Sequence, residues 1–191
     1  MAMSGMTICA YLWVGWFAIW MIWAIRGKRT QQREGVSSRL SYTVLNVAAF
    51  WLMFAGDVEQ QWLRTRLYAL NPWVEALGIA ITLAGLAFAI WARAYLGGNW
   101  SSAVTVKVGH QLVRSGPYRW VRHPIYSGMI LAMLGTALVR HQVRGLIAVV
   151  LLYAGFKIKS KIEEQTMAAT FGAEYAEYAS TTGAIVPRLR E

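Results

Sequence analysis

The residues best placed to do chemistry form one short segment, Gly116-Pro117-Tyr118-Arg119-Trp120-Val121-Arg122-His123-Pro124-Ile125-Tyr126-Ser127-Gly128. It leads directly into an apolar stretch, and Pro124 suits the first position of a helix. Backbone N–H groups at a helix start are unpaired and carry partial positive charge. With Arg119, Arg122 and His123 beside them, they predict a site for an anionic group.

A second polar cluster follows the last apolar stretch of the chain. Lys159 and Glu163 are four residues apart, so they share one face of a helix. Such a pair is often a solvated surface pair, but its position just beyond an apolar segment favours a functional role. Glu163 and Glu164 are adjacent and therefore about 100° apart around a helix. That separation does not predict an acid/base dyad across a substrate.

Several other chemistries have no matching pattern. His110 and His141 stand in different loops from His123, so no metal site is predicted. No Gly-rich phosphate loop and no dinucleotide-binding fingerprint occurs in its strand-to-helix context. The one cysteine, Cys9, lies inside an apolar run and is interpreted as a core residue.

The elements that must position these residues are membrane helices. About 20 apolar residues span a bilayer as a helix, and apolar content is 57% with ten tryptophans. We predict an all-α integral membrane protein with five spans, at 7–25, 40–56, 73–92, 125–139 and 145–156. The last two form a helix-turn-helix hairpin within 124–156, for which a re-entrant hairpin is the alternative. Residues 1–92 would hold three helices, and residues 93–191 the cofactor-binding, catalytic region.

The distribution of basic residues gives this topology an orientation. Five Lys and Arg occur in each of the loops 26–39, 93–124 and 157–191, against two in each of 57–72 and 140–144. This fifteen-to-four bias predicts an external N-terminus, a cytoplasmic C-terminus and a cytoplasmic active site. The net charge of +10 is therefore attributed to topology and anionic lipid headgroups rather than to nucleic acid.

Smaller patterns complete the expected organisation. Gly78 and Gly85 are seven residues apart, as are Gly128 and Gly135, which predicts faces where helices approach closely. The segment 57–72 is predicted to hold a short interfacial helix anchored by an aromatic residue. The alternation in 103–108 predicts a short strand.

Two motifs together resemble a known family. His110-x-Leu112-Val113-x-x-Gly116-x-Tyr118-x-x-x-Arg122-His123-Pro124-x-Tyr126-x-Gly128 is similar to the cofactor motif of isoprenylcysteine carboxyl methyltransferases and their phospholipid-methyltransferase relatives. Glu163-Glu164, followed by Phe171-Gly172-x-x-Tyr175-x-x-Tyr178 and Pro187, resembles the C-terminal signature of that family. Asn99-Trp100-Ser101 also fits, and the resemblance covers roughly residues 95–190.

The resemblance implies methyl transfer from S-adenosylmethionine by a membrane enzyme without a Rossmann domain. It assigns acceptor-side catalysis to Lys159 and Glu163. In the family an arginine stands where this chain has Lys159, which keeps the charge but loses a planar two-point grip on a carboxylate. It assigns cofactor binding to one larger set: His110, Leu112, Val113, Tyr118, His123, Pro124, Tyr126 and Glu164.

Alternatives remain at this point. An NADPH-dependent membrane reductase of the sterol-reductase type would use an equivalent pocket. A channel or small transporter would need ionisable residues within the spans, where only Glu75 occurs. The expected partners are the lipid bilayer and a lipophilic small-molecule acceptor, with no obligate protein partner. A prenylated cysteine carboxylate, a phospholipid amine, a small thiol and an isoprenoid acid are all open as acceptor.

Overall fold

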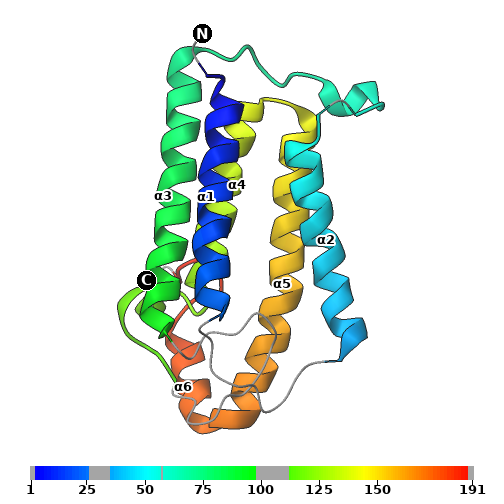
Figure 1. Ribbon diagram of the computed structural model, residues 1–191. Helices are drawn as coiled ribbons and strands as arrows, with labels where there is room; N and C mark the ends of the chain where they lie inside the picture. Colours follow the sequence, from blue (N-terminus) through cyan, green and yellow to red (C-terminus); the bar gives the residue numbers. More distant parts are fainter. Residues whose placement is uncertain (1–2, 26–34, 57, 98–111, 189–191) are drawn as a thin grey trace.

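A computed structural model describes residues 3–25, 35–56, 58–97 and 112–188, and this part of the chain is helical without a named strand. The long helices run nearly parallel or antiparallel as one bundle (Figure 1). Their bounds are α1 Gly5–Ile25, α2 Val36–Phe54, α3 Pro72–Leu96, α4 Pro124–Arg140 and α5 Val143–Phe171. Shorter elements are η1 Gln61–Arg64, η3 Gly116–Arg119 and α6 Ala173–Thr181.

The helices group as α1, α3 and α4 on one side and α2 with α5 on the other (Figure 1). The helix α6 lies at the end of the bundle where α3 and α5 finish and α4 begins. We call this the α6 end, and the opposite end the far end. All the site residues that the sequence predicts within the described chain are near the α6 end.

Each of the five predicted spans corresponds to a helix, but not every helix is both long and apolar enough to cross a membrane. Within the described residues, Gly5–Trp23 and Pro72–Leu96 are long and apolar enough, while Pro124–Arg140 is apolar but shorter. The helix α5 extends well past the predicted end at 156, because the polar stretch from Lys157 to Phe171 continues the same helix. The count of five spans is therefore not confirmed. The helices α4 and α5 form a helix-turn-helix hairpin, and its full crossing of the membrane stays a prediction.

Among the described helices, α3 and α4 share the most extensive contact, and glycines make their close approach possible. A Cβ on Gly85 would lie 2.4 Å from the backbone nitrogen of Ala132 and 2.5 Å from the carbonyl oxygen of Gly128. A Cβ on Gly135 would lie 2.5 Å from the carbonyl oxygen of Gly78. The two glycine steps predicted from sequence therefore meet each other across one antiparallel interface, backbone against backbone.

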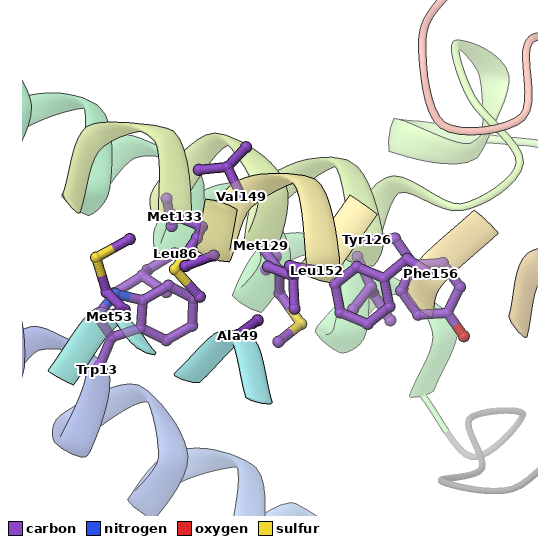
Figure 2. Close-up of a cluster of buried hydrophobic side chains, with 14 of the residues drawn as sticks. Trp13, Ala49, Met53, Leu86, Tyr126, Met129, Met133, Val149, Leu152 and Phe156 are labelled. Carbon is purple, nitrogen blue, oxygen red and sulfur yellow. The ribbon is translucent and has the colours of Figure 1, made fainter. Parts of the chain in front are cut away.

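The core between the two groups of helices is filled by large apolar side chains (Figure 2). Trp13 of α1 packs edge-on against Phe50 of α2, with ring centroids 4.9 Å apart. Its indole N–H donates to Thr136 of α4 at 3.0 Å, so the polar atom of this buried ring is satisfied. Towards the α6 end the same core continues through Leu152 and Phe156 to Tyr126 (Figure 2).

At the far end, two arginines of the α4–α5 turn hold the C-terminus of α2. Arg140 donates to the carbonyl of Ala55 at 2.7 Å, and Arg144 donates to Ala55 at 3.0 Å and to Gly56 at 2.9 Å. These carbonyls end a helix and lack intrahelical partners, so positive side chains suit them. In the loop between α2 and α3, the predicted interfacial helix is a single 3₁₀ turn, η1, with Trp62 exposed.

Three predicted features lie outside the described residues. They are His110, the triplet Asn99-Trp100-Ser101, and the short strand at 103–108.

Candidate active site

The start of α4 is built by a proline on one side and the C-terminal segment on the other. Pro124 occupies the first turn of α4, directly after His123. The backbone N–H groups of Arg122 and His123 donate to the carbonyls of Gly183 and Ala184, both at 2.9 Å. This pairing fixes the backbone of Arg122 and His123 and sends both side chains towards α5.

The helix α5 brings a lysine and two glutamates to the same place. It continues beyond the apolar core at Phe156, and its next turns carry Lys159, Glu163 and Glu164. The ring of His123 lies between the two carboxylates: Nδ1 is 3.3 Å from Oε2 of Glu163, and Nε2 is 3.1 Å from Oε1 of Glu164. Adjacent glutamates thus share one partner, because the two ring nitrogens of histidine reach in different directions.

Tyr126 ties this arrangement to the core. Its hydroxyl donates to Oε1 of Glu163 at 2.6 Å. Its ring stacks on His123, with centroids 5.4 Å apart and planes 5° apart, and on Phe156, with centroids 4.5 Å apart and planes 7° apart. The Nζ atom of Lys159 lies 4.0 Å from the same Oε1 of Glu163.

Arg122 uses its guanidinium entirely within the protein. Nε and Nη2 contact Oε1 of Glu164 at 2.9 and 2.8 Å. Nη1 donates to the carbonyls of Ala179, at 3.0 Å, and Thr182 at the end of α6. Glu164 is thus the carboxylate that Arg122 contacts, while Arg119 is exposed with its guanidinium 6.0 Å from the Trp120 ring centroid.

We call six residues that these contacts join the α4–α5 cluster: Arg122, His123, Tyr126, Lys159, Glu163 and Glu164.

The cluster shifts the pKa values of His123, Glu163 and Glu164 in the directions that favour their charged forms. Burial alone would lower the pKa of His123, but hydrogen bonds and charge from Glu163 and Glu164 outweigh it and raise the pKa above its ordinary value of 6.5. Burial would raise the pKa of Glu163, yet His123 and Lys159 lower it below 4.5. The pKa of Glu164 is likewise lowered against burial, by His123 and Arg122. Near neutral pH both carboxylates are ionised.

The other predicted residues contact neighbouring parts of the fold. The hydroxyl of Tyr118 donates to the carbonyl of Ala92 at 3.3 Å, and Tyr178 donates to the carbonyl of Tyr118 at 2.6 Å. Burial raises the pKa of Tyr178 to about 12, so this donor keeps its proton. Val113 packs against the core, and Leu112 is half-buried. No cluster of His, Cys, Asp or Glu suited to a metal ion occurs among the described residues.

Sequence reasoning missed two aromatic residues of this site. Phe156 is the stacking partner of Tyr126, and Tyr42 of α2 lies with its ring centroid 5.4 Å from Nζ of Lys159. Both stand in apolar stretches where an aromatic residue is ordinary core material, so nothing in the pattern marks either one.

Parts of the chain are similar to known proteins. The chain is 34% identical over 79 residues to protein-S-isoprenylcysteine O-methyltransferase of Saccharomyces cerevisiae, covering 41% of this chain and 33% of that protein. It is 30% identical over 124 residues to the cobalt-zinc-cadmium resistance protein CzcN of Cupriavidus metallidurans, covering 62% and 53%. The matched segments thus span from a third to about half of these relatives.

Among solved structures, a eukaryotic intramembrane Ras methyltransferase, isoprenylcysteine carboxyl methyltransferase, shares the fold. The TM-score is 0.53 at 23% identity, and the match covers 77% of this chain and 52% of that one.

The helical bundle thus shares its fold with an intramembrane methyltransferase, and part of the sequence is similar to isoprenylcysteine O-methyltransferases. The phospholipid methyltransferase family profile matches residues 73–174, which is more than half of the chain and includes the whole α4–α5 cluster. The chain belongs to the phospholipid methyltransferase family.

Proposed function

We propose that this protein transfers a methyl group from S-adenosylmethionine to a lipophilic acceptor with an anionic end, at the α6 end of the bundle. The observation that carries the proposal is the α4–α5 cluster. It sets two ionised carboxylates, a lysine and stacked aromatic rings at the end of an apolar helix bundle. The excess of Lys and Arg in the loops at this end supports a cytoplasmic orientation.

The carboxylate of Glu164 suits the ammonium and the ribose hydroxyls of S-adenosylmethionine. All contacts that Glu164 makes with the described residues use Oε1, while its side chain is 27% exposed. Oε2 is therefore the atom that would accept from the ammonium or a ribose hydroxyl. His123 would orient Glu164 towards the ligand. When bound, the cofactor supplies a methyl group on a positively charged sulfur, which negative charge and aromatic faces favour.

Acceptor binding falls to Lys159 and Glu163. The ammonium of Lys159 would hold an anionic group of the acceptor, and Glu163 fixes that ammonium from the other side. A carboxylate nucleophile carries no proton to be removed, so the residues mainly position it and balance charge. A protonated lipid amine would instead meet the positive charge of Lys159. We therefore infer a carboxylate acceptor, such as a prenylated cysteine or an isoprenoid acid.

The protein would receive such an acceptor from the membrane. The α4–α5 cluster continues directly from the apolar core at Phe156, so an acyl or prenyl chain and its polar end can be in their preferred surroundings together. The reductase alternative gains no support from the relatives described above.

Two measurements on detergent-purified protein test this function. Calorimetric titration with S-adenosylhomocysteine should give saturable binding that Lys159→Met leaves within about threefold. Methyl transfer to N-acetyl-S-farnesylcysteine should fall about 100-fold in that variant, the scale expected when one charge-stabilising group is removed. No binding by folded protein would overturn the cofactor assignment. Methylation of phosphatidylethanolamine vesicles in place of the farnesylcysteine would overturn the acceptor assignment.

A further inference from the structure

The ammonium of Lys159 lies between two tyrosine rings that come from different helices. Its Nζ is 5.4 Å from the ring centroid of Tyr42 on α2 and 5.6 Å from that of Tyr126 on α4. A cation within about 6 Å of an aromatic centroid is attracted by the ring face, more strongly where water is excluded. The Lys159 side chain is only 13% exposed and Tyr42 only 4%, so water is largely excluded here.

A glycine allows α2 to deliver Tyr42 to this position. Gly155 is one helical turn before Lys159 on α5, and Asn46 is one turn after Tyr42 on α2. A Cβ on Gly155 would lie 3.2 Å from the carbonyl oxygen of Tyr42 and 2.2 Å from Oδ1 of Asn46. The missing side chain thus lets the backbone of α2 approach α5 just where Tyr42 must reach Lys159.

Lysine needs such support more than arginine would. Its charge is a point at the end of a flexible four-carbon chain, without the planar fork by which arginine grips a carboxylate. Glu163 restrains the ammonium from one side at 4.0 Å, a longer separation than a hydrogen bond. The two ring faces restrict it from other sides. Of these two rings, Tyr42 lies outside the residues 73–174 that match the family profile.

We propose that Tyr42 is a positioning residue that holds the Lys159 ammonium for the anionic end of the acceptor. The part that concerns the acceptor rests on the function proposed above, whereas the contact between Tyr42 and Lys159 does not. Tyr42 acts through its ring face, so phenylalanine should replace it and an aliphatic residue should not.

The contact itself can be tested without any turnover. The five lysines are dimethylated with ¹³C-formaldehyde, which keeps their positive charge. The Lys159 signal is assigned by its loss in Lys159→Arg. It should lie upfield of the other lysine signals because of the two rings, keep that shift in Tyr42→Phe and lose part of it in Tyr42→Leu. An unshifted Lys159 signal in the unsubstituted protein, or the same signal in Tyr42→Leu, would overturn the proposal.

Kinetics test the consequence for the acceptor. With N-acetyl-S-farnesylcysteine, Tyr42→Leu should raise KM about tenfold, within the range of a desolvated cation–π contact, and leave affinity for S-adenosylhomocysteine within about twofold. Tyr42→Phe should restore KM to within about threefold. Tyr11→Leu, a tyrosine 65% exposed on α1, is the matched control and should change neither quantity.

A double-substitution cycle separates positioning from general damage. In a Lys159→Met background, Tyr42→Leu should have no further effect on KM, because the partner of the ring is gone. An equal loss in both backgrounds would show that Tyr42 merely supports packing, and the positioning role would be refuted. If the unsubstituted protein does not methylate the farnesylcysteine, the acceptor assignment fails, while the lysine signals still decide the contact.

Discussion

Replacing Arg122 with lysine should destabilise the protein although the charge is kept. The guanidinium of Arg122 reaches Glu164 with Nε and Nη2 and the carbonyls of Ala179 and Thr182 with Nη1. It therefore joins the start of α4, the middle of α5 and the end of α6. A lysine ammonium is a single point charge, so it cannot contact Glu164 and the carbonyls of Ala179 and Thr182 at the same time.

The size of the effect follows from these contacts. Hydrogen bonds that involve a charged group contribute roughly 1.5–3 kcal/mol each, and removing one partner of a buried pair costs roughly 3–5 kcal/mol. The side chains of Arg122 and Glu164 are 12% and 27% exposed, so water partly compensates. We expect a loss of about 3 kcal/mol. For a chain of this length that corresponds to a Tm about 6–12 °C lower.

Thermal unfolding in detergent, followed by far-UV circular dichroism, measures this change. Arg119→Lys is the matched control, because Arg119 is exposed and contacts the ring of Trp120. The control should lower Tm by about 2 °C or less. If Arg122→Lys lowers Tm no more than the control does, the contacts of Arg122 with α5 and the end of α6 contribute no stability, and this prediction is wrong.

Two further predictions concern packing and pH. Gly85→Ala should cost about 1–3 kcal/mol, because its Cβ would meet backbone atoms of Ala132 and Gly128 that cannot rotate away, and the lowered Tm measures it. Gly15→Ala, with nothing within 4 Å of its Cβ, is the control; a similar loss there would refute the packing argument. The raised pKa of His123 means that its stabilisation is present below pH 6.5 and is lost as pH rises through the raised value. The Tm gap between the unsubstituted protein and His123→Gln should therefore be largest between about pH 4.5, the ordinary glutamate pKa, and pH 6.5; a gap that grows above pH 7 would contradict this.

The helices and the glycine interface are the parts of the fold that sequence patterns predict well. For most helices, the ends predicted from apolar length lie within a few residues of the ends in the structure. The exception is α5, whose apolar part ends at Phe156 although the helix continues to Phe171. Hydropathy cannot detect that extension, because a helix leaving an apolar environment changes its composition without changing its hydrogen bonds.

The candidate site is predicted in its membership more than in its geometry. The two motifs name His123, Tyr126, Glu163 and Glu164, which the structure brings together. Helical spacing alone separates the two glutamates and does not anticipate a histidine between them. Tyr42 was not predictable, because its role depends on how two helices distant in sequence pack.

The arginines at the far end bear on how α2 can move. They fix the C-terminus of α2 to the α4–α5 turn, whereas Tyr42 lies 12 residues earlier on the same helix, about 18 Å away. A tilt of about 5° around the fixed end would move Tyr42 by roughly 1.6 Å while the arginine contacts and the α3–α4 interface stay in place. The two arginines thus anchor α2 at the end away from Tyr42, and a rotation of α2 about that anchor would change the distance between the Tyr42 ring and the Lys159 ammonium.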